Sequence, residues 1–312
     1  MASLETMVPV SEIGEGGAPE ALAFRPPYDW GHLERFLADH ATPGVEVVAP
    51  GRYARSFSLD GRCGTLSVHP AAGNLLVRIW CPGLREGRSA ILARLRRMFD
   101  LDADPSAIAH GFARDPFVAG LAARRPGLRM PGAFDEFELA VRAILGQQVS
   151  VAAATGLAGR LVAAFGTPLT PAERGEQADL THLFPTPEQL VEAEISRVLN
   201  IPRARGRAIR NVAAATIAAT DFLSPGADLD TTVARLKALP GIGDWTAHYI
   251  AMRALGQTDA LPAGDVGLMR ALDLGSGRPN RAQLLDRSEA WRPWRAYAAL
   301  HLWAEDAARR TG

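Results

Sequence analysis

Two glycines in the string Leu-Pro-Gly-Ile-Gly, residues 239–243, constrain this chain more than any other feature of its sequence. The spacing of Val233 and Leu236 predicts one helix that enters the turn, and a second helix is predicted over residues 244–255. Glycine has no Cβ atom, so the backbone of the turn can approach a large partner closely. The first N–H groups of the second helix have no partner within the helix and lie at the positive end of its dipole. The string therefore predicts an anion site that needs no charged side chain.

A phosphate site made of backbone N–H groups is compatible with the zero net charge of the chain. Its 312 residues include 34 basic and 34 acidic side chains, so the overall charge does not by itself attract nucleic acid. Backbone N–H groups could still hold a phosphate of DNA. A tight helix–helix turn without any ligand is the structural alternative, and a lone Gly-x-Gly would not decide between the two.

Composition excludes several classes of protein. Hydrophobic residues make up 47% of the chain, enough for a core, and no run of apolar residues is long enough to cross a membrane. Two cysteines, Cys63 and Cys81, are too few for a disulfide scaffold or a four-cysteine metal site. Residues 1–20 lack the basic start and apolar run of a secretory signal, which predicts a cytoplasmic protein.

The hydrophobic pattern changes about a third of the way along the chain and predicts an α+β fold. Residues 1–23, which are small and acidic, are predicted to form a flexible tail, and residues 24–105 a small domain with an antiparallel sheet and helices. The rest is predicted to be all-α, in two helical subdomains. One comprises residues 106–130 with 258–312, and the other residues 131–257 with the glycine turn.

Alternation of apolar and polar residues predicts the strands of the small sheet at residues 53–59, 64–68 and 75–80. Helical spacing predicts accompanying helices at residues 32–39 and 89–99.

Capping residues mark the elements that follow. Asp135 is predicted to cap a helix, with Glu138 at the position of a capping box. Residues 149–165 form the next predicted helix, and residues 167–186, rich in Pro, Thr and Gly, a surface connection.

Further strings give the chain a specific resemblance. Gly264 and Asp265 follow Trp245 by about twenty residues, and with the glycine turn they resemble the helix-hairpin-helix base-excision DNA glycosylases. Within that superfamily the chain is similar to bacterial 3-methyladenine DNA glycosylase II, an alkylation-repair family. This resemblance runs from about residue 24 to 305 and rests on the strings at residues 26–30 (Pro-Pro-Tyr-Asp-Trp), 53–56 (Tyr-Ala-Arg-Ser), 125–129 (Arg-Pro-Gly-Leu-Arg), 142–147 (Arg-Ala-Ile-Leu-Gly-Gln) and 291–295 (Trp-Arg-Pro-Trp-Arg).

The resemblance implies a monofunctional DNA glycosylase of base-excision repair. Such an enzyme flips an alkylated base, such as 3-methyladenine or 7-methylguanine, out of duplex DNA and hydrolyses the N-glycosidic bond, leaving an abasic site. Asp265 is the carboxylate expected to stabilise the oxocarbenium-like sugar. A helix N-cap is its structural alternative, since an apolar helical run starts at Val266. The two roles are compatible, because a cap holds the carboxylate in place.

Aromatic side chains are expected to form the pocket for the flipped base. Trp245 and Tyr249 are four residues apart and share one face of a helix. The resemblance adds Trp303 and, from the N-terminal domain, Phe36. An alkylated purine is positively charged, so electron-rich rings attract it by about 0.5–2 kcal/mol. Ordinary aromatic core is the alternative interpretation.

The resemblance also implies contacts with DNA. Gln148 is at the position of the wedge that fills the space left by the flipped base, where the resembled family has an apolar residue. A polar residue that ends a helix is the alternative. Phosphate is expected at the glycine turn, at Gly241, Gly243, Asp244 and Thr246.

A monovalent cation, sodium or potassium, is implied at the same turn, held by the backbone carbonyls of Lys237, Leu239 and Ile242. No cofactor is required by the expected reaction. The expected partner is double-stranded DNA containing alkylated bases, bound by a monomer that is associated with the nucleoid through DNA and not with a membrane.

Two other functions stay open. A helix-hairpin-helix module can simply bind DNA, although such a module needs neither Asp265 nor an aromatic pocket. The other is a glycosylase for oxidised purines. Bifunctional members of the superfamily carry a lysine two residues after the Gly-x-Gly turn, which forms a Schiff base with the sugar. Trp245 stands at that position here, and Lys237 is the only lysine in the chain.

Overall fold

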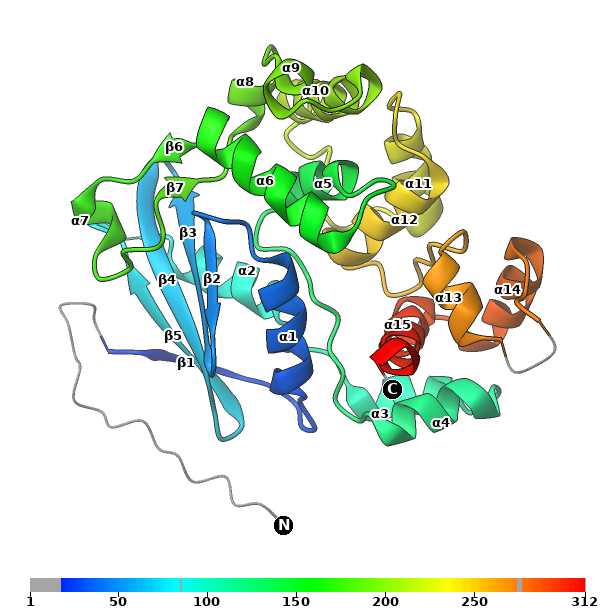
Figure 1. The fold of residues 1–312 in the computed structure, drawn as a ribbon. Helices are drawn as coiled ribbons and strands as arrows, with labels where there is room; N and C mark the ends of the chain where they lie inside the picture. Colours follow the sequence, from blue (N-terminus) through cyan, green and yellow to red (C-terminus); the bar gives the residue numbers. More distant parts are fainter. Residues whose placement is uncertain (1–17, 85, 274–276, 312) are drawn as a thin grey trace.

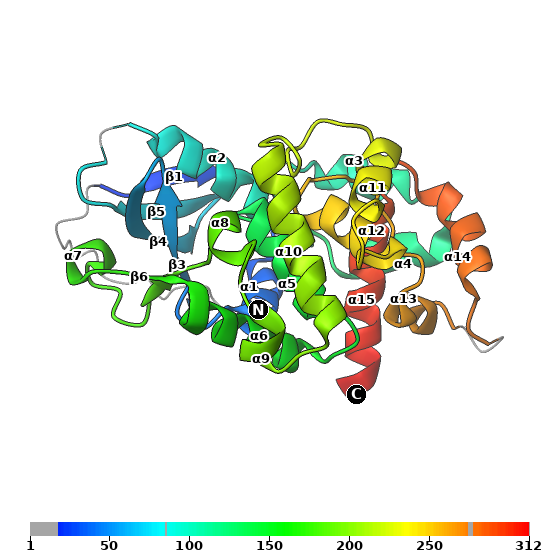
Figure 2. The ribbon, with the colours of Figure 1, turned by 90° about the horizontal axis from the view of Figure 1, so that it is seen from above.

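The computed structural model describes residues 18–84, 86–273 and 277–311, and it places a five-stranded sheet beside a larger helical part (Figure 1, Figure 2). The strand order is β1-β5-β4-β3-β2, and each pair of neighbours is antiparallel. The strands are β1 (Glu20–Ala23), β2 (Glu46–Ala49), β3 (Arg52–Leu59), β4 (Arg62–Ala71) and β5 (Asn74–Trp80). The predicted α+β fold, with its small N-terminal antiparallel sheet, is confirmed.

One face of the sheet is covered by the two predicted helices. Tyr53 and Phe57, two inward positions of β3, are buried with side chains of α1 (Trp30–His40) and α2 (Arg88–Met98) in one hydrophobic cluster. Alternation along β3 sends the intervening Ala54 to the opposite face.

The opposite face is covered by a segment that the sequence predicts to be a surface connection. This segment contains β6 (Thr167–Pro168), α7 (Pro171–Arg174) and β7 (His182–Leu183). Its side chains Leu169, Leu180 and Leu183 are buried against Ala54 of β3. The segment lies at the surface, as predicted, since most of its residues are exposed or half-buried. The sequence does not predict its packing on the sheet, because apolar residues scattered among Pro, Thr and Gly have no regular period.

The predicted flexible tail is corrected in part. Residues 1–17 lie outside the described residues, but Glu20–Ala23 forms β1 and pairs with β5. The strand β2 at the other edge of the sheet is likewise absent from the prediction. Each of these strands has four residues, of which only one has a buried side chain, so neither shows an alternating pattern in the sequence. They are defined by the pairing of their backbone groups with a neighbouring strand.

The helical part is built from short and medium helices that share one core. Its buried side chains, such as Leu121 and Ile144, form one hydrophobic cluster that includes residues of both predicted helical subdomains. The division into subdomains therefore stays a prediction. The helices are α3 (Pro105–Gly111), α4 (Pro116–Arg124), α5 (Glu136–Leu145), α6 (Val151–Phe165), α8 (Pro187–Leu190), α9 (Ile195–Leu199), α10 (Arg203–Ala218), α11 (Leu229–Lys237), α12 (Asp244–Arg253), α13 (Val266–Ala271), α14 (Arg281–Ser288) and α15 (Arg295–Thr311).

Buried ion pairs join the sheet to the helical part. Arg55 of β3 donates to Glu138 of α5 at 2.6 Å, and these side chains are only 4% and 3% exposed. Arg142 of α5 bonds both Glu138, at 2.9 Å, and Glu46 of β2, at 2.8 Å. Asp135 caps α5, as predicted, by accepting the Glu138 N–H. The predicted capping box is wrong, because the Glu138 carboxylate bonds the two arginines instead of the start of the helix.

Within the described part of the chain, no helix combines the length and the apolar character that crossing a membrane requires.

Candidate active site

The carboxylate of Asp265 lies at the start of α13 and accepts three N–H groups. Its Oδ1 accepts the Leu268 backbone N–H at 3.1 Å and the Trp303 indole N–H at 3.0 Å. Its Oδ2 accepts the Trp245 indole N–H at 2.9 Å. Asp265 is thus the N-cap of α13 and is also held by side chains of α15 and α12. The geometry is compatible with both interpretations of this residue, the cap and the catalytic carboxylate.

A glycine allows the helices around Asp265 to pack closely. A Cβ atom at Gly267 would lie 3.0 Å from Oδ1 of Asp265, 3.3 Å from the Trp303 ring and 3.4 Å from Oδ2 of Asp306. Gly267 is buried, and Trp303 and Asp306 belong to consecutive turns of α15. The absence of a side chain at Gly267 therefore brings α15 and its indole to the carboxylate.

Three of the four predicted aromatic side chains contact one another. The ring of Trp245 stacks on that of Tyr249 with centroids 4.9 Å apart and an interplanar angle of 12°. Trp303 meets Tyr249 edge-on at 6.4 Å. All three are half-buried, so part of each ring stays accessible. Phe36 stacks instead on His40 of α1 at 4.0 Å.

Arg253, at the end of α12, links Phe36 to the other rings. Its guanidinium carbon lies 4.5 Å from the ring centroid of Phe36 and 5.3 Å from that of Tyr249. It donates to the Tyr249 hydroxyl at 2.5 Å and to the Pro131 carbonyl at 2.6 Å. A guanidinium can only donate, so the Tyr249 oxygen accepts and its own proton remains available to another acceptor.

Arg253 is not among the predicted site residues, although the sequence holds a signal for it. It follows Tyr249 by four residues and Trp245 by eight, a spacing that places all three on one face of a helix.

The glycine turn joins α11 to α12 and packs on α10. Gly241 has φ +96°, and a Cβ atom there would lie 2.5 Å from the Cβ of Ala208, so only glycine fits. Gly243 is exposed, and a Cβ atom there would meet nothing within 4 Å. No side chain caps α12 at Gly243. The start of α12 therefore combines uncapped N–H groups with an open surface.

Asp244, the first residue of α12, places a negative charge at this helix start. It is bonded by Lys237 at 2.9 Å and by Arg281 at 2.8 Å. Burial disfavours the charged carboxylate, but these hydrogen bonds outweigh burial and lower the pKa of Asp244. One carboxylate between two cations leaves a net positive charge beside the uncapped N–H groups.

The loop between α5 and α6 is tied to the turn by Gln147. Its amide nitrogen donates to the Gly241 carbonyl at 3.0 Å and to the Thr246 hydroxyl at 3.1 Å. The neighbouring Gln148 is exposed and adopts φ +57°. The structure thus places Gln148 on an open loop next to the turn, and its role as a wedge stays a prediction. Thr246 is buried and its hydroxyl is bonded by Gln147, so its phosphate contact stays a prediction.

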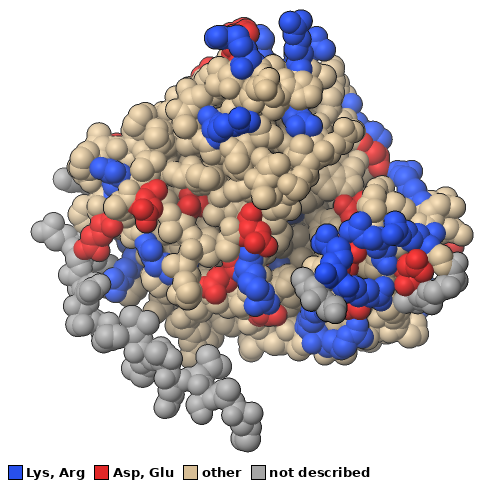
Figure 3. Space-filling model, in the orientation of Figure 1, with Lys and Arg blue, Asp and Glu red and all other residues tan. Residues whose placement is uncertain are grey.

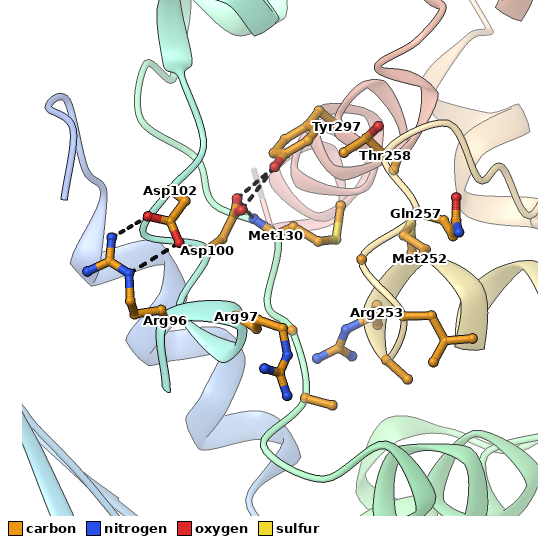
Figure 4. Close-up of a pocket in the computed structure, with 16 residues that line it drawn as sticks. Arg96, Arg97, Asp100, Asp102, Met130, Met252, Arg253, Gln257, Thr258 and Tyr297 are labelled. Atoms are coloured by element: carbon orange, nitrogen blue, oxygen red, sulfur yellow. Dashed lines mark hydrogen bonds and ion pairs between the residues drawn. The ribbon is translucent and has the colours of Figure 1, made fainter. Parts of the chain in front are cut away.

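A cavity of about 310 Å³ lies between α2, residues 130–133 and the end of α12 (Figure 4). In it, Asp100 accepts the Tyr297 hydroxyl and the Met130 N–H at 3.0 Å each, and burial raises the pKa of Asp100 to about 6. Arg253 also lines this cavity, whereas Asp265 and the predicted aromatic side chains do not. The cavity is therefore separate from the Asp265 site.

Known proteins with similar sequences identify the family. The model of the AlkA N-terminal domain matches residues 20–135, and that of the HhH-GPD superfamily base excision DNA repair proteins matches residues 141–294. DNA-3-methyladenine glycosylase 2 of Escherichia coli is 35% identical over 285 residues, which cover 90% of this chain and 95% of that protein. The chain belongs to the HhH-GPD superfamily. The resemblance to bacterial 3-methyladenine DNA glycosylase II is confirmed.

Two more relatives extend the comparison for this HhH-GPD protein. The probable bifunctional transcriptional activator/DNA repair enzyme AlkA of Mycobacterium tuberculosis is 42% identical over 283 residues, 90% of this chain. The chain spans only 56% of the length of that relative. The structure of a 3-methyladenine DNA-glycosylase from Archaeoglobus fulgidus aligns with a TM-score of 0.79 over 93% of this chain and 98% of its own. Its sequence is 21% identical, so this likeness shows the shared fold alone.

Proposed function

We propose that this HhH-GPD protein is a monofunctional DNA glycosylase that removes alkylated bases from double-stranded DNA and leaves abasic sites. It acts as a monomer on DNA in the cytoplasm. The observation that carries the proposal is the carboxylate of Asp265, held between the indoles of Trp245 and Trp303. The relative in Escherichia coli, named DNA-3-methyladenine glycosylase 2, supports the substrate class. The direct test is release of 3-methyladenine and 7-methylguanine from methylated duplex DNA, resolved by chromatography.

Asp265 supplies the charge that the reaction needs. Breaking the N-glycosidic bond leaves positive charge on the sugar, and a carboxylate fixed by three hydrogen bonds stabilises it without reorganising. The base leaves with the bonding electrons, and water attacks the sugar. An alkylated purine is already cationic, so it is a good leaving group and no general acid is required.

Arg253 refines the expected role of the rings. Its guanidinium already lies against Phe36 and Tyr249, so a second cation is not favoured at those two ring faces. We therefore assign the attraction of a cationic base to the indoles of Trp245 and Trp303. The Tyr249 hydroxyl, which accepts from Arg253, can donate its proton to an acceptor atom of the flipped base.

Trp245 stands where bifunctional members have a lysine, which leads to a prediction about cleavage of the DNA strand at abasic sites. A Schiff base needs an amine. The only lysine, Lys237, lies on α11, on the opposite side of the turn from Trp245, and is paired with Asp244. We therefore expect the purified protein to leave abasic sites unbroken and borohydride to trap no covalent complex with DNA. A trapped complex would contradict the one-step reaction, and its loss in Lys237→Arg would identify the lysine as the amine and favour an oxidised-purine glycosylase.

The glycine turn is proposed to hold a phosphate of the DNA backbone. Gly243→Ala is expected to weaken binding to duplexes of different sequence by a similar factor, because the turn contacts phosphate and not base edges. The added methyl group meets nothing within 4 Å in the free protein, so stability should be unchanged. Anisotropy titrations with several duplexes measure the effect, and Gly156→Ala on α6, which is also exposed with nothing within 4 Å, is the matched control. A loss confined to one sequence would show that the turn reads bases.

The monovalent cation implied by the family would bind at the same turn. The carbonyls of Lys237, Leu239 and Ile242 belong to one short stretch, and that of Leu239 accepts the Ile242 N–H at 3.1 Å with one lone pair left over. These carbonyl groups therefore suit a hard cation. Bound there, the ion would add positive charge next to the phosphate. Among the described residues, no cluster of three or more His, Cys, Asp or Glu side chains is placed to hold a metal ion.

A further inference from the structure

Basic side chains gather over α4, α13, α14 and the end of α15, beside the hollow in this face of the molecule (Figure 3). Five of them share the carboxylates of Glu305 and Asp306 on α15. We call Arg124, Arg125, Arg270, Arg309 and Arg310 the arginine cluster.

The arginine cluster carries more positive charge than its partners neutralise. Arg124, Arg125 and Arg309 each bond Glu305 at 3.2 Å. The other two arginines bond Asp306, at 2.7 and 3.5 Å. Five cations on two carboxylates leave an excess of three charges. If Asp273, whose backbone carbonyl accepts from Arg309, and Asp265, which also attracts Arg270, are counted as anions too, an excess of one remains. The chain as a whole is neutral, so this is a local concentration of charge.

An ordinary structural role accounts for only part of the arginine cluster. Basic residues stabilise the C-terminal end of a helix, which explains Arg309 and Arg310 at the end of α15. The same preference places Arg124 and Arg125 at the end of α4 and Arg270 at the end of α13. It does not require these three helix ends to converge on two adjacent carboxylates. The side chains of Arg310 and Arg124 remain 65% and 56% exposed, so the excess charge is accessible to a partner.

The arginine cluster begins next to Asp265. The position of a Cβ atom at Gly267 is 3.0 Å from Oδ1 of Asp265 and 3.4 Å from Oδ2 of Asp306. Arg310 follows Trp303 by seven residues on α15, so the cluster extends about 10 Å along the helix from that indole. Neighbouring nucleotides of a DNA strand are roughly 3.4 Å apart, so the cluster is near enough to contact the backbone that flanks a base held at Trp303.

From this placement we propose that the arginine cluster binds the DNA backbone on one side of the flipped nucleotide, as a second phosphate contact besides the glycine turn. The proposal rests on the proposed function, since it takes duplex DNA as the partner. Arginine forks bind phosphate oxygens in pairs, and Glu305 and Asp306 hold the forks in place without cancelling their charge.

Salt dependence of binding tests the arginine cluster. The double variant Arg309→Gln/Arg310→Gln and the wild-type protein are titrated against a duplex with a tetrahydrofuran abasic-site analogue, and against the undamaged duplex, from 50 to 200 mM NaCl. The logarithm of the affinity falls with the logarithm of the salt concentration, and each lost phosphate contact reduces the magnitude of this slope by about 0.9. We expect the slope to fall by about one to two for both duplexes. Arg62→Gln/Arg88→Gln, on the sheet domain, removes the same charge and should leave the slope unchanged.

An unchanged slope in Arg309→Gln/Arg310→Gln, or an equal fall in the control variant, would overturn the proposal. Release of bases from methylated duplex by the wild-type protein is measured in parallel. A lowered slope without base release would support the arginine cluster while contradicting the proposed activity. Base release with an unchanged slope would support the activity and reject the cluster.

Discussion

Replacing Asp265 by Asn is expected to reduce base release from methylated duplex DNA to less than about a tenth of the wild-type rate. The substitution keeps the shape of the side chain, and Asn is as good an N-cap as Asp, so α13 should persist. It removes the negative charge that stabilises the sugar. It also places an amide N–H opposite the Trp245 or Trp303 indole, both of which donate to the carboxylate in the native protein. Affinity for DNA should be kept or improved.

Single-turnover release of methylated bases, resolved by chromatography, measures this effect. Asp228→Asn is the matched control, because Asp228 caps α11 through the Thr231 N–H and lies outside the site. The control should retain the wild-type rate. If Asp265→Asn retained more than about a tenth of that rate, less than roughly 1.4 kcal/mol of transition-state stabilisation would be lost, and Asp265 would not be the catalytic carboxylate.

The parts of the site that could be predicted from the sequence are those that depend on residues close together in the chain. The glycine turn is such a case, because Gly241 needs a positive φ and close packing on α10, which only one residue type allows. Asp265 is another, since it directly precedes an apolar helical run and caps it. Trp245 and Tyr249 share one helix, so their spacing alone predicts their stacking.

The rest depends on contacts between segments far apart in the chain. The arginine cluster assembles from α4, α13 and α15, and no local pattern relates Arg124 to Glu305. The edge strand β1 has one buried side chain, so its pairing with β5 decides its structure. The missing capping box has the same cause, because Arg55, from a strand more than eighty residues earlier, competes for the Glu138 carboxylate.

That competition leads to the largest expected effect on stability. Glu138→Gln removes the carboxylate that Arg55 bonds at 2.6 Å and leaves a nearly buried guanidinium without its countercharge. Breaking a buried pair in this way costs about 3–5 kcal/mol of unfolding free energy, a large fraction of the 5–15 kcal/mol that holds a typical protein folded. Urea unfolding followed by circular dichroism measures the change. Glu289→Gln, which removes the exposed partner of Arg292, should change stability little.

A double variant separates the cost of an unpaired charge from the loss of a contact. Replacing a buried pair by apolar residues of similar volume is often neutral, whereas removing one partner is not. Arg55→Met/Glu138→Met should therefore be more stable than Glu138→Gln, although it lacks the whole pair. Glu46 attracts both Arg142 and Arg55, so in Glu138→Gln two arginines share this one carboxylate, whereas in the double variant Arg142 has it alone. This adds to the expected difference between the two variants. If the double variant were the less stable of the two, the pair would hold the sheet to α5 by its own attraction, and the cost of Glu138→Gln would not come from an unpaired charge.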